Sequence, residues 1–170
     1  TSYYYLANLY SNTQRFTESE QMNKAALEIR KRLAKSNPQV YEPDLASTYS
    51  NSAILHSNTQ HFAKSEQMFK SALEIRKRLS DSNPQAYEPD LATSYSNLAE
   101  LYRQTQRFTE SEKMHMAAFE IFKQLADANP QVYEPHLAAT YNNLANLYYN
   151  TQRFTESEQM CKDALDIYKR

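Results

Sequence analysis

One eleven-residue segment occurs twice in this chain, as NTQRFTESEQM at residues 12–22 and again at residues 150–160. Two altered copies lie between them, NTQHFAKSEQM from Asn58 and QTQRFTESEKM from Gln104. The phenylalanine of each copy therefore recurs every 46 residues, at Phe16, Phe62, Phe108 and Phe154. Repetition at a fixed period of this size indicates a stacked repeat array, in which each unit buries its apolar face against its neighbours. We therefore predict one elongated array and not a single globule.

A second repeated signature marks the joints between units. Each joint reads Asn-Pro-Gln followed by Tyr-Glu-Pro, beginning at Asn37, Asn83 and Asn129. These joints predict four units, at approximately 1–36, 37–82, 83–128 and 129–170, within one domain spanning residues 1–170. Because the chain opens inside a unit, we expect it to be a fragment of a longer array.

Each unit is predicted to contain two helices, here called helix A and helix B, so the fold class is all-α. In helix A the apolar residues follow helical spacing, as in Leu91, Tyr95, Leu98, Ala99 and Tyr102. Helix A is expected to begin at the second proline of each joint, since proline suits the first helical turn. These prolines are Pro43, Pro89 and Pro135.

Helix B follows a short turn and is expected to be the longer of the two helices. A Ser/Thr-x-x-Glu pattern predicts a capping box at its start in three units, because this pair satisfies free N–H groups reciprocally. The pairs are Thr17 with Glu20, Thr109 with Glu112, and Thr155 with Glu158. A leucine recurs on a second side of helix A, at Leu9, Leu55, Leu101 and Leu147, which predicts that this helix is packed on two sides.

Composition excludes several classes of function. The 19 Lys and Arg residues nearly balance 20 Asp and Glu residues, which argues against a nucleic-acid partner. No apolar run reaches the length of a membrane span, and the single cysteine forms neither an internal disulfide nor a metal-ligand pattern. The absence of glycine rules out the glycine-dependent nucleotide and hydrolase motifs, so no cofactor is expected. The compartment stays open, with the cytoplasm favoured over secretion.

An enzymatic function is the competing class, and the residues do not favour it. The histidines His56, His61, His115 and His136 are scattered and show no metal-ligand spacing. His56 stands where other units carry Tyr10, Tyr102 and Tyr148, so it is interpreted as a core residue. We therefore expect no catalytic residues and no metal.

The order Tyr95, Leu98, Ala99, Tyr102, Phe108, Ser111 and Ala118 resembles the tetratricopeptide repeat pattern. The segment NLAELY at 97–102 is most similar to the long-repeat variant found in kinesin light chains. The unit of 46 residues departs from the usual length of about 34. A glutamine also stands in the turn where the family usually has glycine, at Gln14, Gln60, Gln106 and Gln152. The resemblance implies an α-solenoid with a right-handed superhelix.

In that family the A helices line a concave groove that binds extended peptides or partner segments. The resemblance therefore implies a protein-interaction scaffold whose partner-binding residues lie on the stripe of helix A opposite its core-facing side. We predict this stripe to consist of Asn8, Asn12, Asn51, Ile54, Asn58, Asn97, Glu100, Arg103, Gln104, Asn143, Asn146, Tyr149 and Asn150. Asn is suited to such a groove because its amide both donates and accepts hydrogen bonds.

Two alternatives stay open. An asparagine of the stripe can equally bond a neighbouring helix or face water. The array can also associate head to tail with other copies, since terminal repeats without a polar cap expose apolar surface near Met160, Leu165, Ile167 and Tyr168.

Overall fold

The structure is a computed structural model that describes residues 2–169, and all regular structure in that range is helical. The helices are α1 (Ser2–Asn12), α2 (Phe16–Ser36), α3 (Pro38–Asn58), α4 (Phe62–Ser82), α5 (Pro84–Gln104), α6 (Phe108–Ala128), α7 (Pro130–Asn150) and α8 (Phe154–Tyr168). The all-α prediction is therefore confirmed. Thr1 and Arg170, the outer bounds of the predicted array, lie outside the described residues.

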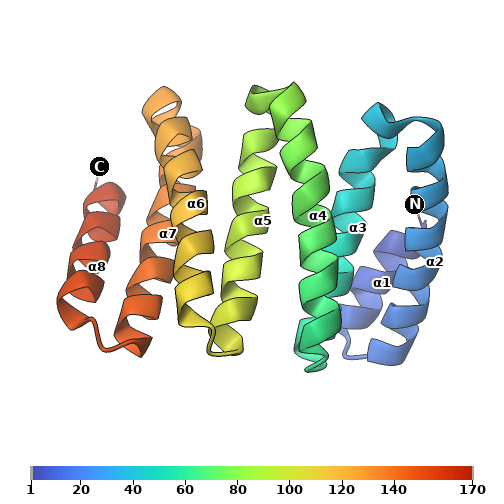
Figure 1. The fold of residues 1–170 in the computed structure, drawn as a ribbon, viewed down its shortest axis with the longest axis horizontal. Helices are drawn as coiled ribbons and strands as arrows, with labels where there is room; N and C mark the ends of the chain where they lie inside the picture. The colour runs from blue at the N-terminus through green and yellow to red at the C-terminus, as the bar shows by residue number, and fades with distance from the viewer. Residues whose placement is uncertain (1, 170) are drawn as a thin grey trace. The chain divides into compact units, whose positions relative to one another are not determined.

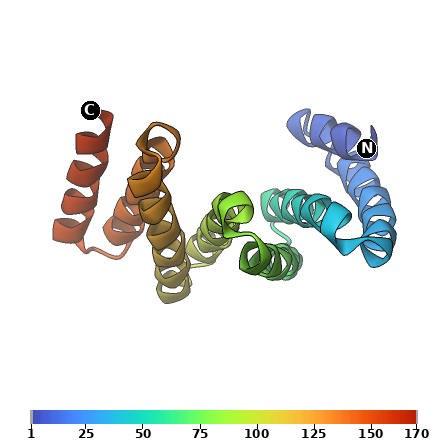
Figure 2. The same ribbon diagram turned by 90° about the horizontal axis from the view of Figure 1, so that it is seen from above.

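The chain forms two compact units, Thr1–Pro84 (unit 1) and Gln85–Arg170 (unit 2). Within unit 1, α1 packs against α2, α2 against α3, and α3 against α4, with neighbouring helices antiparallel (Figure 1). Within unit 2, α5 is bonded to α6, and α7 packs against both α6 and α8. Figure 2 shows the same order within each unit from above. Each unit thus consists of two helical hairpins in which the second hairpin packs on the first.

The turn inside each hairpin has one backbone conformation throughout. The glutamines Gln14, Gln60, Gln106 and Gln152 have φ values of 59–61°. Around Gln106, the Arg107 amide donates to the Tyr102 carbonyl at 2.8 Å, the six-to-one bond of a Schellman motif. Glycine is the residue that usually takes this left-handed position. A chain without glycine therefore places a strained glutamine there four times.

The start of helix A differs from the prediction. Helices α3, α5 and α7 begin at Pro38, Pro84 and Pro130, five residues before Pro43, Pro89 and Pro135, which lie inside the helices. The reason is that each joint holds two prolines and the first one takes the first helical position. As a result α3 and α4 both have 21 residues, and the expectation that helix B is longer was wrong.

The predicted capping boxes were also wrong. Helices α2, α6 and α8 begin at the phenylalanine, one residue before the threonine, and their N-cap arginines cap no N–H group through a side chain. In place of the box, the N-cap arginine bonds the glutamate three residues later. Arg15 Nε, for example, donates to Glu18 Oε1 at 3.0 Å. The N-cap is Arg15, two residues before Thr17, so Thr17 does not occupy the N-cap position that the box requires.

The packing of helix A on two sides is confirmed for the internal repeats. Leu55, Leu101 and Leu147 are 3%, 2% and 1% exposed, whereas Leu9 in α1 is 55% exposed. His56 is buried, as predicted. None of the helices described here is both long enough and apolar enough to cross a membrane.

Candidate functional site

A groove of about 330 Å³ lies in unit 1 between α1 and α3, over α2. Its lining residues are Tyr4, Asn8, Ser11, Asn12, Asn23, Asn51 and Ile54. The residues of α1 and α3 reach it because positions three or four apart lie on one helical face. Four predicted site residues, Asn8, Asn12, Asn51 and Ile54, are thereby brought together. No lining side chain carries a formal charge, so the groove is a neutral hydrogen-bonding surface.

Two of these amides are bonded to each other across the repeats. Asn51 Nδ2 donates to Asn8 Oδ1 at 2.9 Å, which joins α3 to α1. The alternative that a stripe asparagine bonds a neighbouring helix is therefore correct for this pair. Each amide has two donor hydrogens and an acceptor oxygen, so Asn51 Oδ1 and the Nδ2 group of Asn8 keep capacity for a ligand.

The sequence analysis missed Asn23, which lines the same groove from α2. Asn23 is only 5% exposed, and its Oδ1 atom has no hydrogen-bond partner in the structure. The corresponding residue one repeat later is Phe69, which is buried as well. The repeats carry Asn23, Phe69, His115 and Cys161 at this position, and this change of polarity was the signal available in the sequence.

In unit 2 three of the four predicted stripe residues of α5 form a closed cluster, namely Glu100, Arg103 and Gln104. Arg103 Nε donates to Glu100 Oε2 at 2.7 Å, and Gln104 Nε2 donates to Glu100 Oε1 at 3.0 Å. Burial opposes ionisation of Glu100, but the hydrogen bonds from Arg103 and Gln104 outweigh it and lower the pKa of this carboxyl group. The hydrogen bond to Glu100 raises the pKa of Arg103. Both groups therefore stay charged and neutralise each other.

The remaining predicted residues of unit 2 are mostly exposed. On α7, Asn150 Nδ2 donates to Asn146 Oδ1 at 2.9 Å, and Asn143 is exposed. Tyr149 is 64% exposed and packs edge-on against Phe154, with ring centroids 5.6 Å apart. Asn97 on α5 is half-buried. In unit 1, Asn58 is the exposed last residue of α3 and is not among the groove-lining residues.

His115 on α6 is a second buried polar residue, one that no prediction assigned to the site. It is 1% exposed, and neither ring nitrogen has a hydrogen-bond partner in the structure. Burial lowers the pKa of His115 to about 4; the charge of Glu100 opposes this shift and that of Arg103 adds to it. The imidazole is therefore neutral at pH 7.

A family model of the tetratricopeptide repeat matches four stretches of the chain, at residues 1–39, 45–85, 91–130 and 137–170. Among solved structures, BtubC (BKLC) from P. vanneervenii has a TM-score of 0.81 at 24% identity, and the apo form of RapI has a TM-score of 0.78 at 16% identity. The match covers 98% of this chain in both cases, but only 62% of the BtubC chain and 54% of the RapI chain. These likenesses concern the fold alone. No functionally curated protein matches the sequence significantly.

Proposed function

Because the chain belongs to the tetratricopeptide repeat family, we propose that it is a noncatalytic scaffold that binds an extended peptide or partner segment. The binding surface is the stripe of helices α1, α3, α5 and α7 that includes the unit 1 groove. The observation that carries this proposal is the linked pair Asn8 and Asn51 within a neutral groove of about 330 Å³. Repeat arrays commonly use such extended surfaces for recognition.

The groove suits the backbone of an extended peptide. Free amide groups of Asn8 and Asn51 can bond peptide C=O and N–H groups without demanding a side chain. Ile54, which is 41% exposed, offers an apolar contact beside them. Selectivity then comes from stripe positions that differ between units, such as Ile54, Glu100 and Asn146.

We further propose that the two units belong to one array with a 46-residue period and a right-handed superhelix. In this arrangement Asn97, Glu100, Arg103 and Gln104 on α5 are partner-binding residues. The same role is proposed for Asn58 on α3 and for Asn143, Asn146, Tyr149 and Asn150 on α7. Support comes from the recurrence of the stripe in both units and from the four matched stretches of the family model.

The test uses peptides selected from a random library on the wild-type chain. Their affinity is then measured for the double variant Asn8→Ala and Asn51→Ala, with circular dichroism to verify folding. We expect a loss of roughly tenfold or more, because each lost hydrogen bond contributes about 0.5–1.5 kcal/mol. Gln39→Ala is the control, because Gln39 is an exposed amide of the same helix that lies outside both the groove lining and the proposed stripe. Equal binding by the double variant and the wild type would contradict the proposal.

A second function, head-to-tail association of copies, is favoured by the exposed faces of α1 and α8. Leu6 is 38% exposed, whereas Leu98 and Leu144 at the corresponding positions are 2% and 1% exposed. Leu165 on α8 is likewise exposed, while its counterparts Leu27 and Leu73 are buried.

Sedimentation over a wide concentration range tests this second function. The proposal expects the mean mass of the wild type to rise with concentration, and the variants Leu9→Asp and Leu165→Asp to remain monomeric. A constant monomer mass for the wild type would exclude association without affecting the groove proposal.

A further inference from the structure

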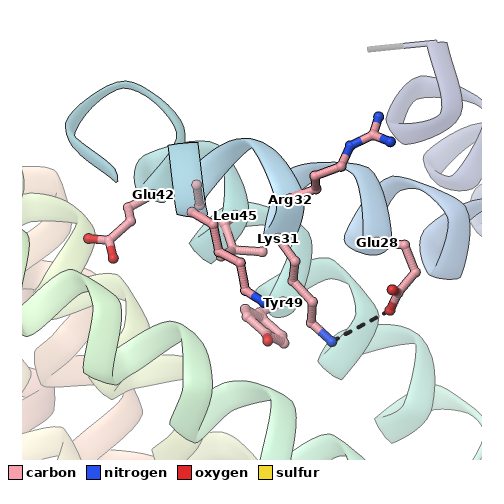
Figure 3. Close-up of a pocket in the computed structure, with 8 residues that line it drawn as sticks. Glu28, Lys31, Arg32, Glu42, Leu45 and Tyr49 are labelled. Carbon is pink, nitrogen blue, oxygen red and sulfur yellow. Dashed lines mark ion pairs between the residues drawn. The ribbon is translucent and has the colours of Figure 1, made fainter. Parts of the chain in front are cut away.

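The joint between α2 and α3 in unit 1 contains a cleft of about 580 Å³, here called the joint cleft. Its apolar floor consists of the buried residues Ala34 and Leu45 and the half-buried Tyr49. Its rim carries charged side chains from both helices, namely Glu28, Lys31, Arg32, Lys35 and Glu42. Figure 3 shows Leu45 and Tyr49 between Glu42 on one side and the Lys31 and Glu28 pair on the other. The volume lies in the usual range of ligand sites, roughly 300–1,000 Å³.

Both rim carboxylates are already engaged by cations. Glu42 accepts a hydrogen bond of 2.7 Å from Arg78 of α4. Glu28 lies 3.6 Å from Lys31 Nζ, the pair joined by a dashed line in Figure 3. Arg32 and Lys35 form no ion pair with any residue from 2 to 169. The joint cleft therefore combines an apolar floor with two cations that no carboxylate of the described chain neutralises.

Unit 2 has a cleft of about 400 Å³ at the same place, between α6, α7 and α8. Its floor has the same residue types, Ala126, Leu137 and Tyr141. Its rim differs in charge, because it holds four carboxylates and one ammonium group. These rim groups are Lys123, Asp127, Glu134, Asp163 and Asp166.

Comparison of the two clefts separates what the fold requires from what it leaves free. The floor residues recur because they belong to the packed faces of the repeat. The rim positions of Arg32 and Lys35 are occupied by Gln124 and Asp127 in unit 2, and all four side chains are exposed. Packing therefore does not dictate a positive rim in unit 1.

We propose that the joint cleft is a docking site for a short acidic segment of a partner protein that carries one apolar side chain. The apolar side chain lies against Leu45 and Tyr49, and carboxylates on either side of it pair with Arg32 and Lys35. The Arg32 guanidinium suits a carboxylate because its planar fork can donate two parallel hydrogen bonds. This site lies apart from the amide groove and does not depend on the proposed groove function.

The probe is a fluorescein-labelled peptide, Asp-Glu-Leu-Glu-Asp with an amidated C-terminus, and the measurement is fluorescence anisotropy. We expect saturable binding that weakens when the salt concentration is raised from about 20 mM to about 200 mM, because salt screens exposed charges. The double variant Arg32→Gln with Lys35→Asp introduces the unit 2 residues, which the same backbone already accommodates. Its affinity should fall roughly five- to tenfold, since exposed ion pairs are individually weak.

Two controls distinguish this site from its alternatives. The peptide Asp-Glu-Ser-Glu-Asp lacks the apolar side chain and should bind more weakly. Replacing Asn8 and Asn51 with alanine should leave binding of the leucine peptide unchanged, so a failure of the groove proposal is recognised separately. No measurable binding by the wild type, equal binding by the Arg32 and Lys35 variant, or equal binding of both peptides would overturn the proposal.

Discussion

The Ser111 hydroxyl donates a hydrogen bond of 2.8 Å to the backbone carbonyl oxygen of Ala99, and both residues are fully buried. Ser19, Ser65 and Ser157 make the same bond to Ala7, Ala53 and Ala145, each at 2.8 Å. The small side chains let the two helices of a hairpin approach closely at this point. The serine–alanine pair thus fixes how helix B lies on helix A in all four hairpins.

Substitution of Ser111 should separate the hydrogen bond from the close packing. Ser111→Ala should lower the free energy of unfolding by about 1 kcal/mol, the usual value of one hydrogen bond. Ser111→Val should lower it further, by about 2–3 kcal/mol in total, because extra methyl groups do not fit a filled contact. Urea unfolding followed by circular dichroism measures both changes, and Thr109→Val on the exposed face of α6 controls for helix propensity. A valine variant as stable as the alanine variant would show that the contact has spare room.

The second packed side of helix A offers a matched pair of leucines. Leu101→Ala should cost about 2–5 kcal/mol, because it removes a side chain that is 2% exposed and leaves a cavity. Leu9→Ala, at the corresponding position of α1, should cost much less because Leu9 is 55% exposed. The same urea titration compares the two variants. Similar costs at both positions would contradict the assignment of burial.

The hairpins and their buried leucines could be predicted from sequence because the same spacing recurs in each unit. Which proline begins helix A could not be predicted from the pattern, since both Pro38 and Pro43 suit a first turn. The structure has Asn37 extended, with φ −148° and ψ 88°, as expected before a proline that starts a helix. The extended conformation of Asn37 therefore marks Pro38, and not Pro43, as the first residue of α3.

The candidate site was predictable in position but not in bonding. Helical spacing placed Asn8 and Asn51 on one stripe, whereas their mutual hydrogen bond depends on side-chain rotamers in two different helices. The burial of the charged residue Arg30 could not be predicted from the sequence either. The guanidinium of the buried Arg30 has a hydrogen-bond partner, since its Nη1 donates to the Asp44 carbonyl at 2.8 Å. At the matching positions of unit 2, Phe122 stacks on His136 with ring centroids 5.2 Å apart. Such exchanges involve partners 14 residues apart, which no local pattern reports.

Glycine at the hairpin turn should stabilise this chain. Gln106 has a φ of 59°, a region that costs a residue with a Cβ atom roughly 1–2 kcal/mol. Gln106→Gly should therefore raise the free energy of unfolding by up to about 1 kcal/mol, after the greater flexibility of unfolded glycine is deducted. Gln104→Gly, two residues earlier at the end of α5, should instead lower it by up to about 1 kcal/mol. The prediction fails if both glycine variants shift the urea midpoint in the same direction.

His115 should make unfolding depend on pH below neutrality. Its pKa is about 4 in the folded chain against 6.5 for the unperturbed group, so the unfolded chain binds the additional proton first as the pH falls. Stability should therefore be lost between about pH 6.5 and pH 4, and the loss should level off below that range. The difference in pKa corresponds to a loss of up to about 3 kcal/mol. Glu100 and Arg103 are the charged groups that act on the imidazole.

The variant His115→Phe isolates this contribution, because unit 1 already buries Phe69 at the corresponding position. It should be at least as stable as the wild type at pH 7, since it removes two unpartnered ring nitrogens from the core. Urea titrations at pH 7, 6, 5 and about 4.5 should give a stability difference that grows as the pH falls, because the carboxylates common to both proteins cancel. A difference that stays constant with pH would mean that His115 titrates normally in the folded chain and that water reaches its ring.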